Sequence, residues 1–136
     1  MREILFRGKR KNGEWVEGNL LYYPDVNRAY IQKGDYFKGG AVEVARATIG
    51  QYTGLKDKNG KRIFEGDLVR ILGDQTNENW KRVDYTALIA FIDGGFCALD
   101  GTIEDHGFRR YGLSRMDFSL EVIGNLHDNP ELLEVE

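Results

Sequence analysis

Cysteine, proline and long apolar runs are scarce in this 136-residue chain. Cys97 is the only cysteine, so no disulfide can form within the chain, and its apolar neighbours predict a small buried side chain. No window approaches the roughly 18 apolar residues of a membrane-spanning helix, and the N-terminus lacks the apolar core of a signal peptide. We therefore expect a protein of the reducing cytoplasm without membrane attachment.

An excess of positive charge is also missing, because the formal net charge is -3 and the pI is near 5.5. This balance argues against bulk electrostatic binding to DNA but still allows a local basic patch. No Lys or Arg follows Arg115, whereas cations crowd the start: Arg2, Arg7, Lys9, Arg10 and Lys11. Three interpretations stay open: weak attraction between solvated termini, head-to-tail contact between subunits, and a basic N-terminal edge that meets an anionic partner.

Histidine is limited to His106 and His127. The segment Glu104-Asp105-His106 is a candidate metal or acid–base fragment. A hydrolase or metal enzyme built on it is the least favoured hypothesis, because metal sites need three or four suitably spaced ligands. The chain has no Cys-x-x-Cys, His-Glu-x-x-His or phosphate-loop pattern. We expect no catalytic residues, no bound metal and no cofactor.

Glycine, by contrast, is abundant, with 17 residues between short β-branched and aromatic runs. This pattern predicts an all-β chain of hairpins. The expected strands are 4–6, 15–23, 29–31, 42–48, 68–72, 84–92, 96–99 and 121–123. A short C-terminal helix is predicted from Asn129 to Leu133, with Asn129 as its cap and Pro130 at its first position. The stretch Asp100–Arg115 lacks periodicity and is expected to be a long loop.

Two turns have a clear physical basis. Asn59-Gly60 favours a two-residue type I′ hairpin, in which both residues take positive φ. Alternatively, Asp57 favours a type I turn that ends with Gly60 in a left-handed conformation. Asp93-Gly94-Gly95 is expected to reverse the chain between two apolar runs.

The segments 8–20 and 54–68 resemble each other. Both contain Lys-Asn-Gly, a short apolar stub and then Glu-Gly-(Asn/Asp)-Leu. Either similar hairpins recruit similar turn residues, or the chain arose by duplication into two β-lobes. We expect one domain over 1–136, with lobes 1–50 and 51–136: an N-terminal β-meander packed on a C-terminal SH3-like small barrel.

The run from Ile49 to Arg70 is specific enough to indicate a family. It resembles the YopX family of small phage and prophage proteins. The resemblance extends to the opening Met1–Gly8, to Glu121-Val122-Ile123-Gly124-Asn125 and to Asn129-Pro130-Glu131-Leu132-Leu133. The resemblance implies a β-rich fold and a phage origin. It implies no activity, cofactor or catalytic residues.

Carboxylates and cations both gather around the Asn59-Gly60 turn. Asp57, Glu65 and Asp67 are a possible acid–base or cation-binding set, but turn chemistry explains them more simply. The candidate binding surface combines cations with aromatic residues: Lys56, Lys58, Lys61, Arg62, Trp80, Lys81, Arg82, Arg109, Arg110 and Tyr111. Such sets neutralise phosphates and stack on bases. Partly buried rings and solvated cations are the simpler explanation.

The favoured hypothesis is a non-catalytic interaction or assembly module of the bacterial host cytoplasm. We expect a homo-oligomer, since short strands leave edges to cover, and a phage or host protein as partner. A nucleic-acid-binding small β-barrel is the alternative, less favoured because the chain is acidic.

Overall fold

A computed structural model describes residues 3–34, 40–72, 84–100, 109–112 and 119–133. Its elements are β1 (Phe6–Lys9), β2 (Trp15–Tyr23), β3 (Arg28–Gln32), β4 (Ala41–Lys56), β5 (Arg62–Phe64), β6 (Asp67–Leu72), β7 (Asp84–Ile92), β8 (Gly95–Asp100), β9 (Arg109–Gly112), β10 (Ser119–Asn125) and the 3₁₀ helix η3 (Pro130–Leu133). The all-β prediction is confirmed. Two compact units divide between Gly54 and Leu55, whereas the lobe boundary after Gly50 stays a prediction.

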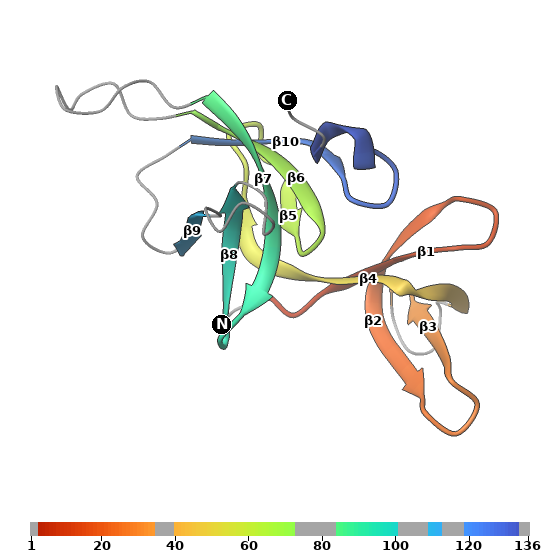
Figure 1. The fold of residues 1–136 in the computed structure, drawn as a ribbon. Helices are drawn as coiled ribbons and strands as arrows, with labels where there is room; N and C mark the ends of the chain where they lie inside the picture. Colours follow the sequence, from red (N-terminus) through yellow and green to blue (C-terminus); the bar gives the residue numbers. More distant parts are fainter. Residues whose placement is uncertain (1–2, 35–39, 73–83, 101–108, 113–118, 134–136) are drawn as a thin grey trace, which may run out of the picture. The chain divides into compact units, whose positions relative to one another are not determined.

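In the first unit, four antiparallel strands follow one another as a meander (Figure 1), and β1 pairs with β4 in addition. The strands β1 and β3 therefore each have a partner on both sides. The core of this unit consists of the buried residues Val16, Ala29, Ile31 and Val44, against which Phe6, Leu20, Val42 and Ile49 pack.

The two long strands of this unit each change partner along their length. Residues 15–18 of β2 pair with β1 and residues 19–23 pair with β3. At this change of partner, a Cβ on Gly18 would overlap the backbone carbonyl of Gln32. Similarly, β4 changes from β3 to β1 after Val44, and a Cβ on Gly8 would lie 2.7 Å from a Val44 methyl carbon. Glycine is thus required sterically at both points where a strand changes its pairing partner.

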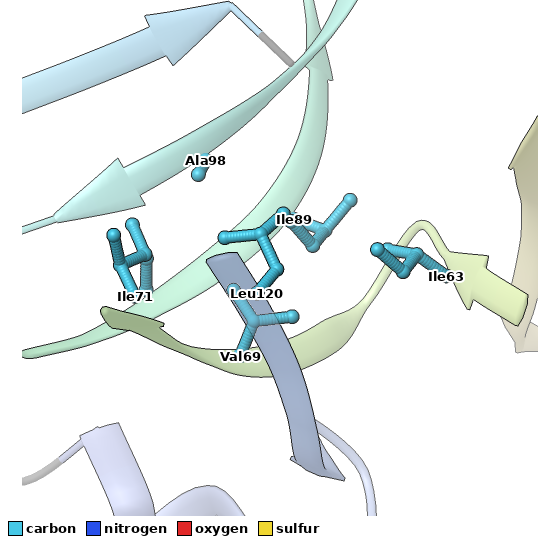
Figure 2. Packing of buried hydrophobic residues seen from close by; sticks show 7 residues of the cluster. Ile63, Val69, Ile71, Ile89, Ala98 and Leu120 are labelled. Carbon is cyan, nitrogen blue, oxygen red and sulfur yellow. The ribbon is translucent and has the colours of Figure 1, made fainter. Parts of the chain in front are cut away.

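In the second unit, the strand order is β10-β6-β7-β8-β9, and every neighbouring pair is antiparallel. The strand β5 instead neighbours β4. Figure 2 shows the buried core formed where β5, β6, β7, β8 and β10 contribute Ile63, Val69, Ile71, Ile89, Ala98 and Leu120. These aliphatic side chains, together with Ala87, exclude water from the interior of the unit.

The hairpin turn at Asp57–Lys61 takes the second of the two forms left open by the sequence. The Gly60 N–H donates to the Asp57 carbonyl at 3.0 Å, and only Gly60 takes positive φ, at 81°. This is a type I turn followed by a left-handed glycine. The type I′ turn occurs instead at Asp93-Gly94, where φ is 53° and 81°, respectively.

The turn at Arg10–Glu14 has the same backbone geometry. The Gly13 N–H donates to the Arg10 carbonyl at 2.9 Å, and Gly13 has φ of 91°. The following Glu-Gly segments differ, because Gly18 continues β2 while Gly66, at φ of 92°, bends the chain between β5 and β6. The last strand also returns differently, since β4 pairs with β1 and β10 pairs with β6. The shared turn therefore reflects similar turn chemistry more than a shared topology.

Three local predictions need correction. The first strand is β1 at 6–9 instead of 4–6, because Arg7 and Lys9 fill ladder positions between two neighbours. The expected loop at 100–115 contains β9, which pairs with β8 despite its charged sequence. The C-terminal helix is a 3₁₀ helix, and the Asn129 side chain accepts a hydrogen bond from the Asn125 N–H at 3.2 Å. The Asn129 side chain therefore stabilises the turn between Asn125 and Asn129.

In the described part of the chain, no helix combines the length and apolar composition that crossing a membrane requires.

The change of pairing partner at Gly18 gives a test of the first unit. We expect Gly18→Ala to lower the free energy of unfolding by about 1–3 kcal/mol or more, because the added methyl group overlaps a backbone carbonyl. Gly40→Ala is the matched control, because nothing lies within 4 Å of a Cβ there. Urea unfolding followed by circular dichroism measures both, and equal stabilities of the two variants would contradict the steric argument.

Candidate functional site

Two of the three acidic candidates, Asp57 and Asp67, have structural roles. We call the turn at Asp57–Lys61 the second turn, and the turn at Arg10–Glu14 the first turn. Asp57 is only 8% exposed, and its Oδ1 accepts hydrogen bonds from the backbone N–H groups of Asn59 at 2.8 Å and Lys61 at 2.9 Å. Its Oδ2 accepts a third, from the Val122 N–H at 2.9 Å. This confirms turn chemistry for Asp57 and adds a long-range contact that the sequence did not predict.

The contact with Val122 joins the turn to the outer side of β10. Beside it, the Lys58 N–H donates to the Leu120 carbonyl at 2.9 Å, and the Lys58 Nζ lies 2.8 Å from the Glu121 Oε2. An edge strand presents outward N–H and carbonyl groups at alternate residues, and these contacts satisfy two of them. The turn thus covers part of the β10 edge.

The other carboxylate of this region closes the next turn. Asp67 is 1% exposed, and its Oδ2 accepts a hydrogen bond from the Phe64 N–H at 2.7 Å. Between them, the Gly66 N–H donates to the Ile89 carbonyl, and its own carbonyl accepts from the Leu126 N–H, both at 2.8 Å. The corner between β5 and β6 is therefore held by backbone bonds to β7 and to the end of β10.

The pKa of the Asp57 carboxyl group is lowered from its ordinary value. Burial raises this pKa by disfavouring the charged form, but the three backbone N–H bonds and the positive charge of Lys61 lower it by more. The carboxylate therefore stabilises the fold above the unfolded-state pKa of about 4, and this stabilisation is lost as the pH falls through the folded-state pKa.

The candidate basic surface is brought together only in part. The second hairpin consists of β4, the turn at Asp57–Lys61 and β5. It exposes four of the cations: Lys56, Lys58, Lys61 and Arg62. The strand β9 contains Arg109, Arg110 and Tyr111, and it lies at the opposite end of the strand order from β10. Trp80, Lys81 and Arg82 lie outside the described residues.

The remaining candidates are the two histidines, the acidic residues beside His106, and Cys97. The fragment Glu104-Asp105-His106 lies outside the described residues. His127 is exposed, and its backbone N–H donates to the Asn125 Oδ1 at 3.0 Å. Cys97 is buried, as expected. Within the described segments, no three His, Cys, Asp or Glu side chains are grouped closely enough to hold a metal ion.

A hollow that the sequence did not predict lies on the outer face of β2, β3 and β4. We call this hollow, of about 430 Å³, the tyrosine face; its lining residues are Leu21, Tyr23, Val26, Arg28, Tyr30 and Ala41. Tyr23 and Val26 are 50% and 62% exposed, and the rings of Tyr23 and Tyr30 meet edge to face with centroids 5.6 Å apart. Aromatic side chains grouped in an exposed hollow are typical of binding surfaces.

Strand register explains why these residues share one face. Leu21 pairs with Tyr30 and Tyr23 pairs with Arg28, so all four point away from the core residues Ala29 and Ile31. The signal in the sequence was the unbroken apolar and aromatic run Leu20-Leu21-Tyr22-Tyr23. A strand with one solvated face normally alternates apolar and polar residues.

The opposite side of the same hairpin is held by polar contacts. The Tyr22 hydroxyl donates to the Asn27 Oδ1 at 3.1 Å, and the Arg46 guanidinium donates to both of these groups. Asn27 takes positive φ, at 56°, immediately before β3. These contacts fix the turn that presents Val26, so the tyrosine face is a preformed surface.

Comparisons with known proteins agree with this fold. Residues 5–134 match the model of the family described as "YopX protein". A crystal structure of protein EF1440 from Enterococcus faecalis is similar, with 28% sequence identity and a TM-score of 0.55, over 98% of this chain and all of that one. Among curated proteins, none matches this chain.

Replacing the Asp57 carboxylate tests the contacts of the second turn. We expect Asp57→Asn to lower the free energy of unfolding by about 2 kcal/mol, because hydrogen bonds to a charged acceptor are lost. The wild-type protein is expected to lose stability below about pH 4, and this pH dependence should be smaller in the variant. Urea unfolding at several pH values measures both effects.

The control for this experiment is Asp25→Asn, at an exposed loop carboxylate, which we expect to change stability by less than about 0.5 kcal/mol. The asparagine side chain would keep one acceptor oxygen for the Asn59 and Lys61 N–H groups, so an Asp57→Asn variant with the stability and pH dependence of the wild type would show that the negative charge and the bond to Val122 contribute nothing to folding.

Proposed function

Because the chain belongs to the YopX protein family, we propose that it is a phage- or prophage-encoded interaction protein, which acts by binding a partner and catalyses no reaction. The observation that carries this proposal is the tyrosine face, an exposed aromatic hollow on a preformed sheet. Tyrosine is enriched at protein interfaces because its large ring buries apolar area while its hydroxyl keeps a hydrogen-bonding group at the edge.

The partner and location follow from the same reasoning. We propose the cytoplasm of a bacterial host as the place of action, with a phage or host protein as the partner and a homo-oligomer as the working form. The single buried thiol at Cys97 fits a reducing compartment. The similar protein from Enterococcus faecalis comes from a bacterium, which fits a bacterial host.

For the second unit, we propose an SH3-like barrel. In support, β6 to β9 run as an antiparallel meander and the last strand, β10, returns to pair with β6. Pairing between the first and last strands of a meander is typical of small β-barrels, including the SH3-like ones.

A pair of matched variants tests the tyrosine face as the binding surface. Val26 and Ile4 are both exposed aliphatic residues of the first unit, at 62% and 60%, but only Val26 lines the hollow. We expect Val26→Asp to reduce at least tenfold the partner recovered by affinity capture from bacteria in which the phage is active, because a charge enters an apolar contact. The variant Ile4→Asp is expected to recover the partner normally.

The mass of each purified variant in solution, measured alongside, shows whether the bound partner is a second copy of the chain. Equal loss or equal retention of the partner in the two variants would contradict the assignment of the tyrosine face. Detection of substrate turnover by the wild-type protein would contradict the non-catalytic role.

A second candidate function is nucleic-acid binding by the second hairpin. The observation that favours it is the joint exposure of Lys56, Lys58, Lys61 and Arg62. We expect conversion of the three lysines to glutamate to abolish any single-strand binding through this hairpin and to flatten its dependence on salt. Titration of labelled single-stranded DNA and RNA at two salt concentrations measures this, and unchanged binding would exclude this surface.

A further inference from the structure

The first hairpin, between β1 and β2, gathers positive charge on a chain that is acidic as a whole. Four exposed or half-buried cations belong to this part of the first unit: Lys9, Arg10, Lys11 and Lys33. Arg7, on the same strand as Lys9, is buried. Two carboxylates accompany these cations, and Glu14 is shared, with its oxygens 3.4 Å from both the Arg10 Nη1 and the Lys33 Nζ. The second carboxylate is Glu17, so the four exposed or half-buried cations outnumber the two carboxylates of this region.

An aromatic ring lies among these cations. Register places Trp15 opposite Lys9 and Glu17 opposite Arg7, so the four side chains share the face of β1 and β2 that lies opposite the core residue Val16. On this face Arg7 is buried, whereas Glu17 is exposed. The Arg7 Cζ lies 4.9 Å from the centre of the half-buried Trp15 ring, and the Lys9 Nζ lies 5.9 Å from it. A separation of 5.9 Å is near the limit of a cation–π contact, so Lys9 is held only weakly over the ring.

A hollow of about 500 Å³ lies beside the turn, lined by Arg10, Lys11, Asn12, Glu43, Val44 and Ala45. Its one carboxylate, Glu43, lies 3.8 Å from Arg28 and so is partly neutralised. The lining thus combines two cations and an amide with a small apolar floor. Such a lining suits a sugar or base that is attached to a phosphate backbone.

The second hairpin has the same turn but a weaker combination of groups. Its Lys58 pairs with Glu121 at 2.8 Å, and its aromatic candidate Trp80 lies outside the described residues. On the first hairpin, by contrast, the Trp15 ring lies within cation–π range of Arg7 and Lys9. The described geometry therefore favours the first hairpin as the site for a polyanion with exposed bases.

We propose that the first hairpin is a binding surface for single-stranded nucleic acid. A base stacks on the Trp15 ring in place of the distant Lys9 ammonium group, and Lys9, Lys11 and Lys33 neutralise the neighbouring phosphates. Duplex bases are already stacked on each other, so they are not available to the ring. None of these residues lines the tyrosine face. Failure of nucleic-acid binding here would therefore not affect the proposal that the tyrosine face binds a protein partner.

The first test is a titration of labelled oligothymidylate, single-stranded and as the matching duplex, at two salt concentrations. We expect salt-dependent binding that favours the single strand. The charge reversal Lys11→Glu should weaken it several-fold and lower the salt slope by about 0.7, the contribution of one phosphate contact. The control Arg70→Glu reverses an exposed charge on β6, in the second unit, and should leave binding unchanged.

Three outcomes would overturn the proposal: no binding, equal binding of duplex and single strand, or binding that is lost in Lys58→Glu and kept in Lys11→Glu. The last outcome would move the site to the second hairpin.

The second test uses the two tryptophans of the chain as separate reporters. Trp80→Phe leaves Trp15 as the only tryptophan, and we expect its fluorescence to be quenched as the oligonucleotide binds. Trp15→Phe leaves Trp80, whose fluorescence should not change. Both substitutions keep an aromatic ring, so we expect folding to be preserved, and circular dichroism checks this. Quenching of Trp80 alone would overturn the proposal.

Discussion

The Asp57 carboxylate is the contact on which the arrangement of the second unit depends. Two of its hydrogen bonds form the local turn, and the third reaches a strand 65 residues further along the chain. A buried carboxylate is stable only when its oxygens are satisfied, and here backbone N–H groups satisfy them. One side chain thereby fixes a local backbone conformation and the position of β10 together. Asp67 forms a local bond only: it accepts from the Phe64 N–H and so closes the corner that leads into β6.

These two aspartates account for the most distinctive segment of the chain, from Ile49 to Arg70. Two of the three carboxylates of this segment, Asp57 and Asp67, accept hydrogen bonds from backbone N–H groups. The same segment also holds exposed cations, Lys56, Lys58, Lys61, Arg62 and Arg70, and Lys58 pairs with Glu121 on β10. Binding chemistry and folding chemistry are thus interleaved residue by residue, and this explains why the sequence alone did not separate them.

The sequence predicted the elements whose signal is local. The strand at 15–23 and the strand at 84–92 were placed with their observed bounds, because alternating β-branched and aromatic residues specify an extended chain. The strand β9 was missed because it is held by pairing with β8 and its own residues give little signal. The tyrosine face was missed for a related reason. Its six lining residues come from two strands, a turn and the start of a third strand, and only the register places them together.

The two hairpin turns share one backbone conformation but begin with different residues, Arg10 and Asp57. In the second turn, the first side chain is also a structural bond to β10, so its chemistry cannot change without loss of that bond. In the first turn, the corresponding side chain only pairs with an exposed glutamate. We therefore expect the first turn to tolerate grafted sequence, such as a foreign loop or a new charge pattern, without loss of the fold of its unit.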